Sequence, residues 1–305
     1  MKILIFGRGA IGTQYGWAFE KAGHTVEFYV REGRKAQYGS SVDLEISDGR
    51  RKKDKKVLEK WPVTLREELD PAENYDLIFL SINPEQVKNA VEFLAPRVGN
   101  ATVLFFNNYG KNPREAVKPI PIEQVAFGFP GAGGGYEGNK LYGILYPSVQ
   151  LGNTADKPSE RETAVQNLFV SAGFRVTVQK DIESWLLNHY VMNTAMEAEV
   201  LKRGSFENVV TSTEALADML RNLKEMVPYL KAKGVKTDAA TNVLALLPAG
   251  LLGFLLKHMM YVPGSAAYEA IAHNHFKAGF AVREVAQDAE TVGITLKRLE
   301  DALSA

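Results

Sequence analysis

The sequence contains no cysteine, and this absence excludes disulfides, thiolate nucleophiles and zinc sites built from cysteine. It also has no excess of charge of either sign, because 36 Lys and Arg residues balance 36 Asp and Glu residues. Proteins that bind duplex nucleic acid usually carry a basic excess, so we expect no nucleic-acid partner. Small secreted domains often need disulfides, so a chain without cysteine fits the cytoplasm better.

Long uninterrupted apolar segments are missing as well. The longest apolar stretch, 243–256, is broken by Pro248, Gly250 and Gly253, whereas a membrane span needs about 18 or more apolar residues. The apolar run 3–6 is too short to be the core of an export signal. We therefore expect a cytoplasmic protein with no membrane partner.

Signatures of metal and serine-hydrolase chemistry are absent too. His273 and His275 stand two positions apart, and such a pair points to opposite sides of a helix, which is poor metal geometry. The sequence has neither an H-E-x-x-H motif nor a G-x-S-x-G motif. We predict no metal site and no serine hydrolase.

What is present is an alternation of strand and helix patterns in the first half of the chain. The apolar run 2–6 indicates a buried parallel strand, the segment 10–22 a helix, and 26–30 a second strand. Strands spaced by helices predict a doubly wound parallel sheet. Further strands are expected at 76–82, 102–106, 149–152 and 175–178, helices at 85–94 and 160–172, and glycine-rich turns at 128–138.

Helical patterns alone continue to the C-terminus. They cover residues 182–201, 212–233, 238–260 and 265–292. A length of 305 residues suggests two domains at about 150 residues each. We predict an α/β domain at residues 1–180 and an all-helical domain at residues 181–305.

The hexapeptide 7–12, GRGAIG, matches the pattern G-x-G-x-x-G. It follows an apolar strand and opens a helix, which is the context in which this pattern binds a dinucleotide. The first glycine permits a tight turn, the second lets the backbone approach a pyrophosphate, and the third lets the helix pack closely on the strand. The helix N-terminus attracts phosphate. The motif predicts a cofactor site of Rossmann type, formed by Gly7, Gly9, Ala10, Ile11 and Gly12.

The end of the second strand decides which cofactor fits. An acidic residue there binds the ribose hydroxyls of NAD, but here the sequence reads Val30, Arg31, Glu32. Arg31 can form a planar fork with the 2′-phosphate of NADP, whereas Glu32 can bind a hydroxyl instead. We predict NADP and assign its 2′-phosphate to Arg31.

Two asparagines follow strands in the predicted sheet. Asn83 follows DLIFLSI and Asn107 follows VLFF, and open α/β sheets bind ligands at the carboxyl ends of their strands. We therefore predict that both asparagines bind the cofactor, with a turn-capping role as the alternative for each. The charged segment 50–56 is interpreted as a solvated hairpin or loop, with a phosphate-binding patch as its alternative.

These residues carry a resemblance to a known family that extends along the whole chain. The segments KILIFGRGAIG, FYVR, DLIFLSINPEQ, VLFFNNYG, the helix around Trp185 and the closing AETVGIT resemble the ketopantoate reductases, or 2-dehydropantoate 2-reductases. The resemblance implies an N-terminal Rossmann domain and a C-terminal helical domain. It also implies that Arg31 holds the 2′-phosphate, that Asn107 lies beside the nicotinamide and the substrate, and that Ser265 binds the substrate.

The second half departs from the family. The family has a lysine where this chain has Asn83, and a glutamate where it has Lys277. The family helix reads W-x-K-L-x-x-N-x-x-x-N, with the lysine as the catalytic acid. Aligned on Trp185, the lysine position is Leu187 and the first asparagine position is Val191. The chain therefore resembles a divergent member of the family.

If the alignment of this helix with the family pattern is shifted by two residues, polar side chains fall at the lysine and asparagine positions. His189, Asn193 and Glu197 recur at intervals of four and share one helix face. We predict that His189 donates the proton, because its pKa of about 6.5 in reference peptides suits neutral pH, and that Asn193 and Asn107 orient the carbonyl. The alternatives are packing of His189 at the domain junction, a structural hydrogen bond for Asn193 and exposure to solvent for Glu197.

We therefore predict an NADPH-dependent reductase of a small 2-keto acid or a related carbonyl compound. One alternative is a reductase of a different ketone or an imine. Another is a non-catalytic NADP-binding sensor or regulatory protein, because the lysine is missing while the glycines and Arg31 remain. The Leu- and Met-rich segment 244–261 is interpreted as the face of a homodimer, with the helical core as its alternative.

Overall fold

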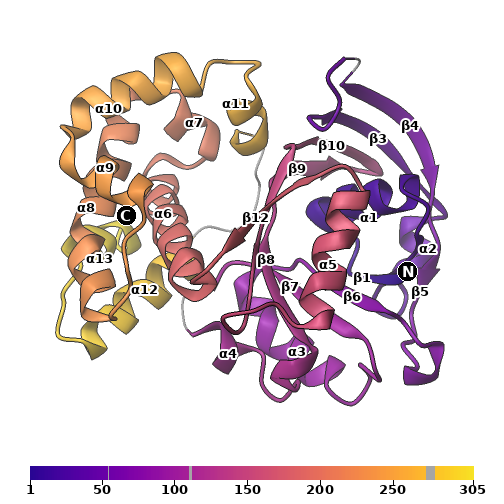
Figure 1. Ribbon diagram of the computed structural model, residues 1–305. Coiled ribbons are helices and arrows are strands. Elements are labelled where there is room, and N and C mark those ends of the chain that lie inside the picture. Colours follow the sequence, from indigo (N-terminus) through magenta and orange to yellow (C-terminus); the bar gives the residue numbers. More distant parts are fainter. Residues whose placement is uncertain (54, 110–111, 273–278) are drawn as a thin grey trace. The chain divides into compact units, whose positions relative to one another are not determined.

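The computed structural model describes residues 1–53, 55–109, 112–272 and 279–305. The chain divides into two compact units, drawn in Figure 1. Unit 1 comprises Met1–Asn107 and Asn112–Ile182, and unit 2 comprises Asn108–Lys111 and Glu183–Ala305. No helix in these described ranges combines the length and the apolar character needed to cross a bilayer.

The main sheet of unit 1 has eight strands in the order β12-β11-β8-β7-β6-β1-β2-β5. All neighbours are parallel except β8 and β11, which pair antiparallel. The predicted doubly wound sheet is confirmed. The bounds are β1 Lys2–Phe6, β2 Thr25–Tyr29, β5 Leu65–Arg66, β6 Leu77–Leu80, β7 Thr102–Phe106, β8 Val125–Phe129, β11 Ser148–Gly152 and β12 Arg175–Gln179.

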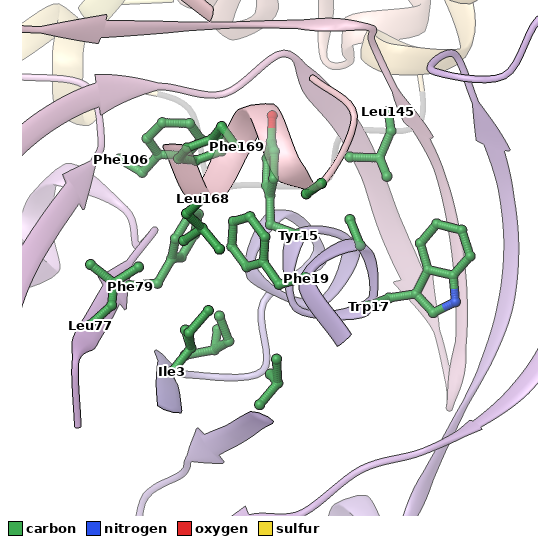
Figure 2. Close-up of a cluster of buried hydrophobic side chains, with 14 of the residues drawn as sticks. Ile3, Tyr15, Trp17, Phe19, Leu77, Phe79, Phe106, Leu145, Leu168 and Phe169 are labelled. Carbon is green, nitrogen blue, oxygen red and sulfur yellow. The ribbon is translucent and has the colours of Figure 1, made fainter. Parts of the chain in front are cut away.

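The helices of unit 1 cover this sheet with a largely aromatic core. Figure 2 shows Tyr15 and Phe19 pointing from α1 toward Phe79, Phe106 and Phe169. The ring centroids of Tyr15 and Phe106 lie 5.2 Å apart in an edge-to-face arrangement, a geometry that aromatic pairs favour. The helices are α1 Ala10–Lys21, α2 Arg34–Tyr38, α3 Val87–Leu94, α4 Pro113–Ala116 and α5 Glu160–Ser171, with single turns η1 Pro71–Glu73, η2 Pro84–Gln86 and η3 Ile122–Gln124.

A second sheet of four strands, in the order β4-β3-β10-β9, is a feature that the sequence analysis missed. Its strands are β3 Ser41–Asp48, β4 Lys56–Pro62, β9 Ala132–Glu137 and β10 Lys140–Leu145. The prediction of turns at 128–138 was therefore wrong, because β8 and β9 occupy most of that segment. A Cβ on Gly134 would lie 2.2 Å from the carbonyl oxygen of Tyr142 on β10, so this glycine permits the close pairing of the two strands.

Helix α1 lies between the two sheets. Every residue from Gly12 to Phe19 is buried, as expected for a helix with packing on all sides. On the side of the second sheet, Gln14 Nε2 donates to the carbonyl oxygen of Gly133 at 3.0 Å. Trp17 Nε1 donates to Glu59 at 3.1 Å on the same sheet. The second sheet therefore fixes α1 from the side opposite β1 and β2.

The charged segment 50–56 connects β3 and β4, which pair antiparallel, so the described part of the segment forms a hairpin connection. Arg50 is committed within unit 1, because its Nε bonds to Asp48 at 2.8 Å and its Nη1 to the carbonyl oxygen of Ala172 at 2.6 Å. Its guanidinium also lies 4.9 Å from the ring centroid of Phe174. These contacts support the structural interpretation of this segment.

The described part of unit 2 contains helices and no strand, so the predicted all-helical half is confirmed. The expected helix at 238–260 is interrupted at Pro248, which has no N–H to continue the helical hydrogen bonds. The expected helix at 265–292 is also not continuous, and its last part follows Gly279 with φ of 106°. The elements are α6 Ile182–Arg203, α7 Phe206–Val210, α8 Thr213–Ala232, α9 Ala239–Leu246, α10 Ala249–Leu255, a π-helix Leu256–Met260, α11 Ala266–Ile271, α12 Phe280–Thr291 and α13 Lys297–Leu303.

Candidate functional site

The carboxyl ends of four adjacent strands carry the residues predicted for the nucleotide site. The glycine motif follows β1, Arg31 follows β2, Asn83 follows β6 and Asn107 follows β7. The chain connects β1 to β2 on one side and later adds β6 and β7 on the other side of β1. The strand order therefore reverses between β1 and β6, and ligands of open α/β sheets bind at such a switch point. We call this set of strand ends the nucleotide edge.

The glycine turn has the geometry that the motif predicts. Gly7 has φ of 91°, in the left-handed region, and its N–H donates to the carbonyl oxygen of Tyr29 at 2.8 Å. A Cβ on Gly12 would lie 2.7 Å from Cγ2 of Ile5. The conformational role of the first glycine and the packing role of the third are therefore confirmed.

The N-terminus of α1 lies at the nucleotide edge, and no acidic side chain of its first turn competes for its backbone N–H groups. Its N-cap is Gly9, which has no side chain to bond the first N–H groups, and its first turn contains no acidic residue. A Cβ on Gly9 would meet only the carbonyl oxygen of Ser81, at 3.8 Å. Ala10 and Ile11 begin the helix and are partly buried against the core of unit 1. This arrangement fits a phosphate group, which the N–H groups and the helix dipole attract.

The two side chains that decide between cofactors, Arg31 and Glu32, are both exposed. The carbonyl oxygen of Arg31 accepts from the N–H of Arg34 at 3.0 Å, so the backbone turns directly after β2. Asn83 is exposed as well, and its N–H donates to Gln86 Oε1 at 3.3 Å at the start of η2. The backbone of Asn83 therefore takes part in this turn, and contact of its side chain with a cofactor stays a prediction.

Asn107 is buried, with 3% of its surface exposed. Its Nδ2 donates to the carbonyl oxygen of Ile82, which ties the end of β7 to the segment after β6. Among the described residues its Oδ1 has no hydrogen-bond partner. Buried amide oxygens are nearly always paired, so an orphaned one at a switch point fits a ligand that donates to it.

Arg8 also lies at this edge, at a variable position of the motif for which the sequence predicts no role. It is buried, and Nη2 of its guanidinium donates to Oδ1 of Asn139, which lies 131 positions away in the chain. The local sequence does not predict this contact, because Asn139 joins β9 to β10 in the second sheet.

The predicted chemical face of unit 2 lies on α6. The rings of Trp185 and His189 stack with centroids 5.2 Å apart and an angle of 6°. Leu187 and Val191, which match the family lysine and asparagine in the tryptophan register, are buried in the hydrophobic core of unit 2. His189 and Asn193, the corresponding residues of the shifted register, are only partly buried.

Glu197, the third residue of the shifted register, is buried, so the alternative of its exposure to solvent was wrong. Its carboxylate accepts a hydrogen bond at 3.0 Å from the N–H of Gly279, the residue before α12. A buried carboxylate needs such donors to offset the loss of hydration. This contact holds α12 against α6 within unit 2.

Burial lowers the pKa of His189 to about 4, and the nearby carboxylate of Asp238 opposes that shift only in part. Burial has this effect because it disfavours the charged imidazolium. At neutral pH the ring is therefore uncharged. It can donate an N–H hydrogen bond in that state, whereas full proton transfer requires the protonated ring.

Ser265 is the N-cap of α11. Its hydroxyl accepts from the N–H of Tyr268 at 3.2 Å and donates to the carbonyl oxygen of Met260 at 2.7 Å. The hydroxyl has one O–H donor, and that donor is already used within unit 2. A lone pair of the hydroxyl oxygen can still accept a hydrogen bond from a ligand. His273, His275 and Lys277 lie outside the described residues. Within the described ranges, no group of three or more His, Asp or Glu residues is arranged to hold a metal ion.

Comparison of sequences relates the first half of this chain to one family. Residues 3–142 match the family model described as ketopantoate reductase PanE/ApbA. A 2-dehydropantoate 2-reductase from Vibrio cholerae is 25% identical over 118 residues, which are 38% of this chain and 34% of that protein. The aligned segment thus spans about a third of the length of this curated relative.

Comparison of structures extends the likeness to both units. A 2-dehydropantoate 2-reductase from Porphyromonas gingivalis has a TM-score of 0.70 and 16% identity, over 100% of this chain and 98% of that chain. A D-mandelate dehydrogenase, solved as a ternary structure with NADH and anilino(oxo)acetate, has a TM-score of 0.73 and 17% identity, over 100% of this chain and 96% of that chain. At these identities the likeness shows a shared fold. Together the comparisons confirm the resemblance to the ketopantoate reductases that the sequence motifs indicate.

Proposed function

We propose that this chain, which resembles the ketopantoate reductases in sequence and fold, is an NADPH-dependent reductase of a small 2-keto acid or a related carbonyl compound. In this proposal residues 1–180 bind the cofactor. Residues 181–305 supply the substrate face and the contact between two copies of the chain. The protein acts in the cytoplasm, where a chain without cysteine needs no oxidising environment.

The observation that carries this proposal is the nucleotide edge itself. It combines a glycine turn, an α1 N-terminus without acidic residues and the orphaned Oδ1 of Asn107 at one switch point. Gly7, Gly9, Ala10, Ile11 and Gly12 hold the pyrophosphate, as helix N-termini do in dinucleotide sites. Asn83 and Asn107 contact the cofactor from the ends of β6 and β7.

The choice of NADP rests on Arg31. Its exposed guanidinium follows β2, where it can bind a 2′-phosphate through two hydrogen bonds. Glu32 beside it is the residue that would favour NAD. Titration of the protein with NADPH and NADH separates the two, and tighter binding of NADH would overturn the assignment of Arg31.

Within this proposal the nicotinamide supplies a hydride, and the protein must supply a proton to the developing alkoxide. His189 donates that proton, Asn193 and Asn107 orient the carbonyl, and Ser265 accepts a hydrogen bond from the substrate. Because the pKa of His189 is about 4, only the protonated minority of the enzyme is active at neutral pH. The expected kcat/KM therefore falls about tenfold per pH unit above that pKa.

A second candidate function is a non-catalytic NADP-binding sensor or regulatory protein. It is favoured by the burial of Leu187 at the position of the family lysine, and by the lowered pKa of His189, about 4, which leaves the ring uncharged at neutral pH. In that case the nucleotide edge binds the cofactor while α6 performs no chemistry.

The test is a set of NADPH oxidation assays on 2-keto acids, other ketones and imines, alongside NADPH titration of the same preparation. Turnover of a 2-keto acid supports the proposal. If the protein reduces another ketone or an imine but no 2-keto acid, the proposed substrate class is wrong. Binding of NADPH without turnover of any compound would favour the sensor, and failure to bind either dinucleotide would overturn both functions.

We propose further that two copies of the chain associate through unit 2. Exposed apolar side chains concentrate in the segment 243–262, which contains α9, α10 and the π-helix, and exposed apolar patches mark interaction sites. The exposed members are Val243, Leu246, Leu247, Leu251, Phe254, Leu255, Met259, Met260 and Val262. We call them the apolar face.

A further inference from the structure

Arg8 occupies a place where a buried cation is unexpected, directly after the first glycine of the motif. Only 9% of its surface is exposed. Its guanidinium contacts two aromatic rings, 4.8 Å from the centroid of Tyr38 and 4.9 Å from that of Tyr136. Such contacts fix the plane of a guanidinium and leave its edges for hydrogen bonds.

One edge of this guanidinium has a partner and another has none. Nη2 donates to Oδ1 of Asn139, whose own Nδ2 donates to the carbonyl oxygen of Ser41 at 3.0 Å and so orients the amide. The Nε of Arg8 is buried and has no acceptor among the described residues. Within the same residues, no carboxylate forms an ion pair with Arg8. Burying a charged donor without an acceptor is unfavourable, which points to an anionic ligand that supplies one.

The position of Arg8 relative to Arg31 shows which part of a dinucleotide it would meet. Strands β1 and β2 are parallel neighbours, with Phe6 paired to Tyr29. Arg8 and Arg31 each stand two residues beyond this pair, at the same edge of two strands that lie about 4.8 Å apart. Tyr38, which covers one face of Arg8, belongs to α2, the helix that begins at Arg34, three residues after Arg31. Arg8 therefore belongs to the side of the edge where β2 ends and the adenosine ribose lies in dinucleotide sites.

We propose that Arg8 is a second cation for the 2′-phosphate of NADP and acts with Arg31 as a specificity-determining residue. This inference rests on the proposed function, because it assigns a further residue to the same cofactor. Within the described residues neither Arg8 nor Arg31 forms an ion pair with a carboxylate, and a dianionic phosphate with three acceptor oxygens supplies charge for both guanidinium groups. The ribose hydroxyls of NAD carry no charge.

The experiment compares the dissociation constants of NADPH, NADH and 2′,5′-ADP for the full chain and its variants. Arg8→Met keeps an unbranched side chain against the two rings and removes the charge. We expect it to weaken NADPH and 2′,5′-ADP at least about tenfold and to leave NADH unchanged. Arg8→Lys keeps the charge without the planar fork, and we expect an intermediate loss. Thermal melting of each variant shows whether it is folded.

Arg161→Met is the matched control, because Arg161 bonds to the carbonyl oxygen of Asn100 and to Thr102 at the opposite edge of the sheet. It should change none of the three constants. Equal losses for NADPH and NADH in Arg8→Met and Arg8→Lys would show that Arg8 only supports the glycine turn, and would overturn the assignment. Unchanged binding of NADPH would overturn it too. If the unmodified chain binds neither NADPH nor NADH, the proposed function itself fails.

Discussion

The nucleotide edge of unit 1 and the α6 face of unit 2 match the family pattern to different degrees. At the nucleotide edge the glycine turn, Arg31 and Asn107 all follow the strand ends on which the sequence places them. On α6 the family's lysine position is Leu187, which is buried in the core of unit 2. The nucleotide edge therefore fits the family motif, whereas the α6 face departs from it.

The two regions differ in what forms the site. The nucleotide edge uses backbone N–H groups and glycines, whose roles depend on the fold and tolerate few side chains. The α6 face uses side chains on one helix, and two of them, His189 and Asn193, are partly exposed and less constrained by packing than the glycines. We infer that the α6 face changes more readily during evolution than the nucleotide edge does.

The largest expected effect is on turnover, and it comes from a substitution on the α6 face that leaves the nucleotide edge unchanged. His189→Leu should lower turnover by about 10²-fold or more, because general acids typically contribute that much. NADPH affinity should stay the same, since it depends on unit 1. Steady-state kinetics and NADPH titration measure the two quantities.

The control for this variant is His258→Leu, because His258 lies on the π-helix of unit 2, where its ring contacts that of Phe254 at a centroid distance of 4.4 Å. It should retain full turnover. If His189→Leu also turns over a true substrate at the original rate, His189 has no part in the mechanism.

The next effect concerns the stability of unit 2 as a function of pH. The pKa of His189 is about 4 in the folded protein and 6.5 in the reference state. The unfolded chain therefore binds the proton more readily, so acid favours unfolding. This contribution is fully present above about pH 6.5 and is lost as the pH falls to about 4, by at most about 3 kcal/mol.

Urea unfolding between pH 4 and pH 7 measures that loss, with His189→Gln as the comparison. The variant cannot titrate at this position, so its free energy of unfolding should fall less over the same range. Identical pH dependence in both proteins would show that His189 titrates normally.

A smaller effect contrasts two glycines in helices. A Cβ on Gly12 would lie 2.7 Å from Ile5, whereas a Cβ on Gly250 in α10 meets nothing within 4 Å. Gly12→Ala should lower the free energy of unfolding by about 1–3 kcal/mol through overpacking and weaken the binding of NADPH. Gly250→Ala should be neutral or stabilising by less than about 1 kcal/mol. Equal stability of the two variants would contradict the packing role of Gly12.

The smallest effect on stability is expected at the apolar face. Leu246 is 83% exposed, so Leu246→Glu should change the free energy of unfolding by no more than about 0.5 kcal/mol. It should nevertheless convert a dimer into a monomer, as light scattering would show. The matched control is Val170→Glu on α5 of unit 1, where Val170 is 58% exposed. A monomeric unmodified protein would exclude the dimer.

Most of the main fold was predictable because local patterns determine it. Apolar runs such as Ile3 to Phe6 indicate strands buried on both faces, and glycine stops such as Gly23 end helices. The second sheet had one signal in the sequence, since polar and apolar residues alternate from Ser41 to Ile46 in β3. Strand β9 had none, because its glycines form a strand only when paired with β10.

The candidate site was predictable where it follows strand ends and not where it depends on distant contacts. Arg31 and Asn107 were found because each directly follows a recognisable strand. The burial of Arg8 was not, because Tyr136 and Asn139 come from the second sheet. The burial of Glu197 likewise depends on Gly279, which lies 82 positions away.

The position of α1 between two sheets has a consequence for exchange of its amide hydrogens with solvent. No fluctuation that opens only one layer exposes this helix, because the other sheet still covers it. Its central amides, from Tyr15 to Phe19, should therefore exchange only when the whole of unit 1 unfolds. The exchange rate of α1 then reports the global stability of unit 1, measured from within the intact chain.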